Sequence, residues 1–278
     1  MAARAVVFAY HDVGVRCLSV LLAHGVDVGL VVTHRDDPKE NIWFGSVERL
    51  ARGHGIAVAL DEVPAFETDF IFSFYYRHML PPDVLARARR GAYNMHGSLL
   101  PRYRGRVPVN WAVLRGERET GATLHEMVAK PDAGRIVGQM AVPILPDDTA
   151  LDVFRKVTVA AEIVLDRALP AILDGTVKPA EQDLSKGSYF GGRKPEDGRI
   201  DWTRSAVEVH NLVRAVAPPY PGAFCEWSGR RIRVNRTRLL PQEAGAAAGP
   251  PGIEQTADGL RARCGDGGRL AILEWEWT

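Results

Sequence analysis

Short apolar runs and helical patterns alternate along the first part of this chain. Residues 4–10 are continuously apolar after Arg4, as in a strand covered on both faces. Strands are also predicted over 28–33, 56–60, 69–75 and 91–95, and helices over 13–24, 45–53 and Pro81–Arg90, where two prolines open the helix. The alternation predicts a parallel α/β sheet with right-handed crossovers. In such sheets ligands bind beyond the carboxyl ends of the strands.

After residue 120 the predicted elements change, first to a pair of strands with a long helix and then to a series of short strands. Two strands are predicted over 120–128 and 134–144, then a long helix over 150–173, a polar segment over 178–197 and a helix over 205–216. Short strand-like runs follow at 222–226, 231–238, 259–264 and 270–274, with a surface loop at 245–252. We therefore expect three parts: an α/β domain over 1–185, a linker over 186–203 and a small open β-barrel over 204–278.

Charge and cysteine content limit the function classes. The net charge of +1 over 278 residues gives no general attraction to nucleic acid or anionic membranes. No apolar run approaches the ~20 residues that span a bilayer. Cys17, Cys225 and Cys264 are widely spaced, which predicts free thiols rather than disulfides or a zinc site. We expect a cytoplasmic protein without a nucleic-acid partner.

Glycine-rich phosphate motifs are missing. The segment after the first strand, residues 11–15, holds one glycine where a dinucleotide fold has three. No Walker-type motif occurs either. The sequence therefore predicts no nicotinamide cofactor.

Asn94 and His96 form the strongest candidate site. They lie two residues apart at a predicted strand end, so their side chains share one face. An amide and an imidazole together suit a reaction that stabilises an oxyanion while a proton moves. A metal site lacks further ligands at suitable spacing, so we expect no metal. Ser98 lacks the G-x-S-x-G turn of a hydrolase nucleophile.

The wider motif resembles a known family. Residues 94–105 and Asp132, within the turn Lys130–Gly134, resemble the signature of the 10-formyltetrahydrofolate-dependent formyltransferases. The resemblance implies a Rossmann-like, parallel-sheet catalytic domain and a small C-terminal OB-like barrel. It also implies that Asn94, His96 and Asp132 are the catalytic trio, with 10-formyltetrahydrofolate as co-substrate.

The resemblance implies roles for this trio. Asn94 would stabilise the oxyanion of the tetrahedral intermediate, and Asp132 would raise the pKa of His96 so that His96 protonates the leaving folate nitrogen. The group that deprotonates the acceptor is left open between Asp132 and water. The sugar nucleotide would lie near residues 98–105 and 190–193. The folate contacts would be His78, Met79, Leu80, Arg106, Val128, Ala129, Lys130, Pro131 and Asp132.

Further motifs are similar to one branch of the family, the UDP-4-amino-4-deoxy-L-arabinose formyltransferases found in bifunctional polymyxin resistance proteins. These motifs include residues 6–12, 72–78, 190–193 and 221–224. The branch implies a UDP-amino sugar as acceptor, in lipid A modification and antibiotic resistance. Its decarboxylase half is absent from this sequence, so we expect either a stand-alone enzyme or an excised domain. The chain could form an oligomer or associate with a separate decarboxylase domain. The segment 60–69 is shorter than in the branch, which predicts a missing helix.

Three alternatives stay open. The chain could be a methionyl-tRNA formyltransferase, could formylate another amino sugar or an amino acid, or could be a silent folate- or RNA-binding module. The near-neutral charge disfavours tRNA. The intact trio of Asn94, His96 and Asp132 disfavours a silent module.

Overall fold

The computed structural model describes residues 3–241 and 249–278. The chain divides into two compact units that interleave along the sequence. The first unit comprises Met1–Gly105, Thr120–Val142 and Arg155–Phe190. The second comprises Arg106–Glu119, Pro143–Phe154 and Gly191–Thr278.

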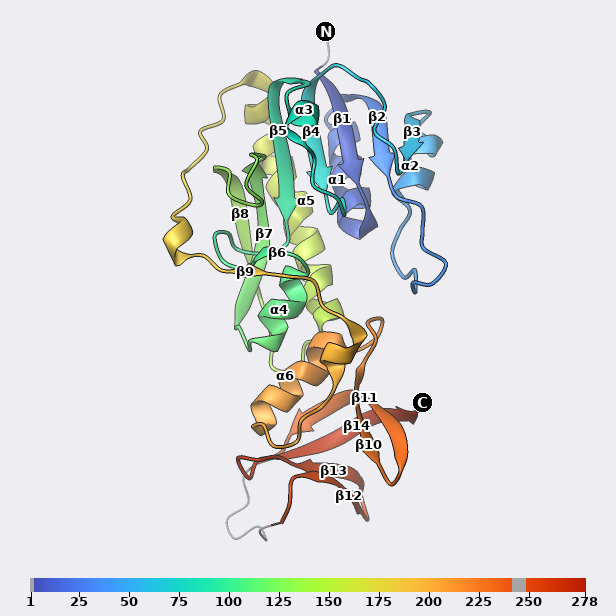
Figure 1. Cartoon of the computed structure of the whole chain (residues 1–278). Coiled ribbons are helices and arrows are strands. Elements are labelled where there is room, and N and C mark those ends of the chain that lie inside the picture. The colour runs from blue at the N-terminus through green and yellow to red at the C-terminus, as the bar shows by residue number, and fades with distance from the viewer. Residues whose placement is uncertain (1–2, 242–248) are drawn as a thin grey trace. The chain divides into compact units, whose positions relative to one another are not determined.

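A seven-stranded sheet forms the centre of the first unit, in the order β3-β2-β1-β4-β5-β7-β8 (Figure 1). Its first five strands pair in parallel, which confirms the predicted α/β sheet. β7 then pairs antiparallel with β5. The strands are β1 (Arg4–Ala9), β2 (Asp27–Thr33), β3 (Ala57–Leu60), β4 (Thr68–Phe74), β5 (Ala88–His96), β7 (Glu119–Glu126) and β8 (Ile136–Pro143).

Apolar side chains cover both faces of this sheet. Val6 and Phe8 of β1 pack in one cluster with Leu80 and with Val84 of the short helix α3 (Pro82–Leu85). The helices α1 (His11–Ala23) and α5 (Ala150–Asp174) lie behind the sheet in the view of Figure 1, with α2 (Val47–Gly53) beside β3. The continuous apolar run of β1 follows from this double burial.

One predicted helix is much shorter than expected. α3 begins at the prolines but ends at Leu85, so the prediction of a helix through Arg90 is wrong. The chain re-enters the sheet at Ala88, which is the partner of Thr68 in β4. Pairing along β4 supplies the backbone hydrogen bonds that a longer helix would have made internally. No helix lies between β3 and β4, as the shortness of residues 60–69 predicted.

The region read as a linker contains regular structure. A 3₁₀ turn, η1 (Leu184–Lys186), precedes β9 (Tyr189–Phe190), and β9 pairs in parallel with β6 (Arg104–Gly105). A second 3₁₀ turn, η2 (Pro195–Gly198), follows. The two-residue strands were too short for the pattern of side chains to reveal.

An open antiparallel sheet forms the second unit, in the order β10-β11-β14-β13-β12. Helix α6 (Ala206–Val216) packs on it and begins with a capping box between Ser205 and Glu208. This arrangement confirms the predicted small β module. The strands are β10 (Ala223–Trp227), β11 (Arg230–Leu239), β12 (Gly252–Thr256), β13 (Gly259–Arg263) and β14 (Arg269–Trp277).

Two elements of the second unit were not predicted. Helix α4 (Pro108–Leu114) starts at a proline, and its buried Val109, Ala112 and Val113 have helical spacing. β12 follows the predicted surface loop, of which residues 245–248 lie outside the described residues. Within the described part of the chain, no helix has the length and apolarity needed to cross a membrane.

Candidate active site

The carboxyl end of β5 carries both residues of the predicted pair. Asn94 is half-buried and His96 is buried, and they lie on one face of the strand as their spacing predicted. The antiparallel neighbour β7 places His125 opposite Asn94. Asn94 Nδ2 lies 3.1 Å from His125 Nε2. His125 was not predicted from the sequence, since only the pairing of β7 with β5 brings it beside Asn94.

The turn between β7 and β8 brings Asp132 to the same place. Asp132 Oδ1 lies 3.6 Å from His96 Nδ1 and 3.6 Å from His125 Nε2. Its other oxygen, Oδ2, accepts a hydrogen bond of 2.8 Å from the backbone N–H of Gly105. The structure thus brings the three sequence-predicted residues together and adds His125 as a fourth member of the cluster.

Hydrogen bonds to carbonyl groups fix the protons on both imidazoles. His96 Nε2 lies 2.8 Å from the carbonyl oxygen of Tyr103, so this nitrogen must carry a proton and donate. His125 Nδ1 likewise donates to the carbonyl oxygen of Glu126 at 2.8 Å. When neutral, His125 therefore accepts at Nε2 from the Asn94 amide, and His96 keeps an unprotonated Nδ1 that faces Asp132.

Burial dominates the pKa of His96. Removal from water lowers this pKa below the ordinary value, and the nearby charge of Asp132 and the bond to Tyr103 offset only part of the effect. The net direction therefore favours the neutral form of His96 in the resting protein. Asp132 does raise the pKa of His96, but by less than burial lowers it.

Asp132 itself is ionised. Burial alone would raise its pKa, yet attraction to the two imidazoles in their protonated forms, together with the bond from the Gly105 N–H, holds the pKa well below its usual range. The cluster therefore combines a fixed negative charge with a neutral imidazole that gains stabilisation when it takes up a proton.

The residues expected to contact folate differ in burial and belong to both units of the chain. Met79 is 60% exposed, whereas Leu80 is buried in the core cluster with Val6 and Phe8. The His78 ring packs edge-on against the His34 ring, at 4.8 Å between centroids. The remaining expected contacts are the exposed Val128, Ala129 and Lys130 with the half-buried Pro131 and Asp132 in the first unit, and the exposed Arg106 in the second.

Strained residues and aromatic rings gather at the carboxyl ends of β1 and β4. His11 and Tyr75 follow these strands with positive φ angles of 68° and 57°. The His11 ring stacks on Phe44 at 3.9 Å and lies 4.5 Å from the Trp43 ring, centroid to centroid. β4 lies between β1 and β5, so this cluster borders the same edge of the sheet as His96.

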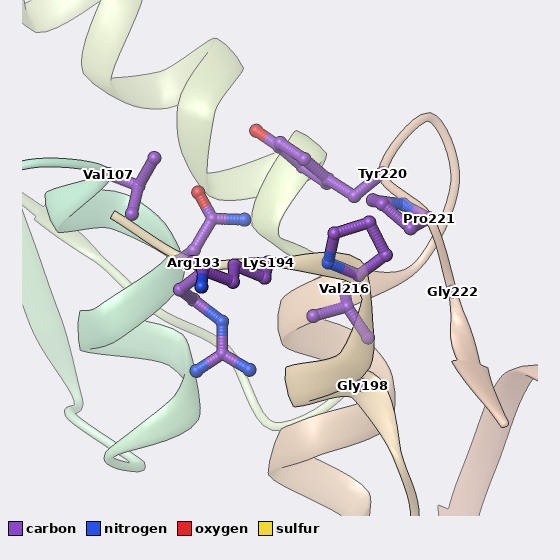
Figure 2. Close-up of a pocket in the computed structure, with 10 residues that line it drawn as sticks. Val107, Arg193, Lys194, Gly198, Val216, Tyr220, Pro221 and Gly222 are labelled. Carbon is purple, nitrogen blue, oxygen red and sulfur yellow. The ribbon is translucent and has the colours of Figure 1, made fainter. Parts of the chain in front are cut away.

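The second unit contains a pocket of about 130 Å³, mainly apolar in its lining (Figure 2). Two cationic residues, Arg193 and Lys194, line it together with Tyr220. Tyr220 is hydrogen-bonded to Asn110, and burial raises its pKa to about 12. Arg193 Nε is buried without a hydrogen-bond partner among the described residues. Val107, also in the lining, has the positive φ angle of 47° that a β-branched residue rarely adopts.

No group of three or more His, Cys, Asp or Glu side chains suited to a metal ion occurs within residues 3–241 and 249–278.

Two family models match the chain. The model described as formyl transferase covers residues 23–169, and the model of the formyl transferase C-terminal domain covers residues 193–278. The first alone spans more than half of the chain.

Solved structures with the same fold include three sugar or amine formyltransferases. The N-formyltransferase from Helicobacter canadensis, solved with folinic acid and dTDP-3-aminofucose, is 20% identical, with 100% of each chain covered and a TM-score of 0.80. WlaRD, a sugar 3N-formyl transferase solved with dTDP and 5-N-formyl-THF, is 21% identical, with 97% of each chain covered and a TM-score of 0.78. A 4-N formyltransferase from Francisella tularensis is 18% identical, with 82% of this chain and 95% of that chain covered and a TM-score of 0.65.

Proposed function

Since the chain belongs to the formyl transferase family, we propose that it transfers a formyl group from 10-formyltetrahydrofolate to the amino group of a nucleotide-linked amino sugar. The observation that carries the proposal is the cluster at the end of β5, where His96 Nδ1 lies 3.6 Å from Asp132 Oδ1 and shares a strand face with Asn94. Two structures of the same fold were solved with a formylated folate and with a dTDP-sugar or dTDP.

The first step is attack of the acceptor amine on the formyl carbon. A C–N bond forms, and the carbonyl electrons move to oxygen. Asn94 has two amide N–H groups and gives one to His125, so the second is available to the oxyanion. A donor fixed in this way in advance stabilises the charge without reorganisation.

The second step moves the proton from the amine to the leaving nitrogen. His96 starts neutral, because burial lowers its pKa, and takes the proton released by the amine at Nδ1. Asp132 stabilises the imidazolium that results. His96 then donates the proton to N10 of the folate as the C–N10 bond breaks, which yields the formamide and tetrahydrofolate.

The co-substrate would be held by the residues that the family resemblance names. In the first unit these are His78, Met79, Leu80 and Val128–Asp132, where main-chain groups near the exposed Met79 and Val128 side chains suit a flat ring. The pocket of the second unit suits the nucleotide of the acceptor, because Arg193 and Lys194 offer cations for phosphates and Tyr220 offers a ring.

We further propose UDP-4-amino-4-deoxy-L-arabinose as the acceptor, which places the product in lipid A modification. The support is the set of motifs shared with that branch, including residues 72–78 and 190–193. The test is formyl transfer from 10-formyltetrahydrofolate to a panel of UDP- and dTDP-linked amino sugars, a free amino acid and methionyl-tRNA, followed by mass spectrometry. Turnover of the UDP-sugar above the others supports the assignment. Turnover of methionyl-tRNA alone would overturn it.

A further inference from the structure

Gln182 contacts the backbone on which Asp132 sits. Its side-chain Nε2 donates to the carbonyl oxygen of Asp132 at 3.1 Å and to that of Gly134. Its Oε1 is buried without a hydrogen-bond partner among the described residues. The Gln182 amide therefore acts on this turn through the two hydrogen bonds that its Nε2 donates.

The chain delivers Gln182 to this turn through one isolated bridge. Ile136 at the start of β8 and Ala180 exchange both backbone hydrogen bonds, with N···O distances of 2.7 and 2.8 Å. The bridge fixes residues 178–182 beside the end of the turn. Gln182 is two residues beyond Ala180, so its side chain reaches back to Asp132 and Gly134.

The turn needs such support because its backbone is strained. Asp132 has a φ angle of +50°, in the left-handed region that is unfavourable for a residue with a side chain. Gly134 lies so close to β7 that a Cβ there would sit 1.9 Å from the carbonyl oxygen of Glu126. A donor that bridges the carbonyls of Asp132 and Gly134 favours this conformation over a relaxed one.

The position of the carboxylate follows from the turn. Asp132 meets His96 and His125 at 3.6 Å, distances at which a small backbone shift changes the interaction strongly. We propose that Gln182 is a positioning residue for the reaction, which holds the Asp132–Gly134 turn so that the Asp132 carboxylate stays against His96. This inference rests on the proposed function for its catalytic consequence.

The test compares Gln182→Met with the wild type, because methionine keeps the length of the side chain and removes both donors. We expect kcat for formyl transfer to fall about 10- to 100-fold, the effect of a misplaced catalytic group. Asp183→Ala is the matched control. Asp183 is the next residue in the chain, and its carboxylate accepts hydrogen bonds from Ser185 and pairs with Lys186. This control should keep the wild-type kcat.

A second readout needs no turnover. The pKa of His96, which is faced by Asp132 and His125, is measured by NMR titration of its ring. Displacement of Asp132 removes the charge that raises this pKa, so we expect a lower value in Gln182→Met. Where that variant does not fold, Gln182→Ala replaces it, because alanine also removes both donors and adds no charge near His96.

The outcomes separate the inference from the proposed function. A wild-type protein that formylates no amine contradicts the function, while the pKa of His96 still tests the role of Gln182. An unchanged pKa of His96 together with wild-type kcat in Gln182→Met overturns the role of Gln182. A variant that only melts at a lower temperature, with both quantities unchanged, overturns it as well.

Discussion

The side-chain amide of Asn94 donates to Nε2 of His125 at 3.1 Å, across the antiparallel pair of β5 and β7. The bond fixes which way the amide faces, and the proposed mechanism uses its second N–H for the oxyanion. His125 is itself fixed by donation to the carbonyl oxygen of Glu126. An amide oriented in this way needs no rearrangement when charge develops.

Replacement of His125 by alanine should therefore reduce catalysis without abolishing it. We expect kcat to fall about 10- to 100-fold, because Asn94 is free to rotate away from the oxyanion. Binding of folinic acid, measured by calorimetry, should change little. The control is His54→Ala, at an exposed position that follows α2. Full activity of His125→Ala would contradict a role of His125 in orienting Asn94.

Parts of this cluster follow directly from the sequence. Asn94 and His96 share a face because strand side chains repeat every two residues, and Asp132 lies in a turn that the sequence marks with proline and glycine. His125 and Gln182 could not be found in this way. Both depend on which backbones become neighbours, namely β7 beside β5 and Ala180 beside Ile136. The net lowering of the pKa of His96 could not be predicted either, since burial cannot be read from charge partners alone.

The fold, too, was predictable where the signal lies in the local sequence and not where it depends on which strands become neighbours. The strands that are buried on both faces, such as β1, were predictable from continuous apolar runs. α3 was overestimated, because a proline marks where a helix begins, whereas its end depended on the pairing of Ala88 with Thr68. The two-residue strands β6 and β9 leave no periodic signal at all.

Acid should destabilise the protein through His11. Burial, together with the charge of Arg77, lowers the pKa of His11 to about 3, against an ordinary value of 6.5. The unfolded chain therefore binds this proton at a higher pH than the folded chain. Stability is full above about pH 7 and falls as the pH drops, by about 2 kcal/mol at pH 5.

The measurement for His11 is chemical denaturation between pH 7 and pH 5. We expect His11→Asn to lose about 2 kcal/mol less than the wild type over this range, because asparagine tolerates the left-handed backbone and does not titrate. Other buried histidines, including His210, contribute equally to both proteins. The same acid sensitivity in both would contradict the assignment to His11.

Gly134→Ala should disrupt the turn that carries Asp132. The new Cβ would sit 1.9 Å from the carbonyl oxygen of Glu126, so the backbone must move. We expect a loss of about 3 kcal/mol of stability, at the upper end for an overpacked site, and a lower kcat in the folded fraction. Gly53→Ala is the control, since nothing lies within 4 Å of a Cβ there. Equal stability of the two variants would speak against a tight turn.

The central claim is that His96, beside Asp132, moves the proton during formyl transfer. The most direct measurement is single-turnover formyl transfer from 10-formyltetrahydrofolate to the best acceptor of the panel, by wild type and His96→Ala, with folinic acid binding measured in parallel. We predict that His96→Ala binds folinic acid as the wild type does but transfers the formyl group about 10²- to 10⁴-fold more slowly. A wild-type rate in His96→Ala would contradict the account.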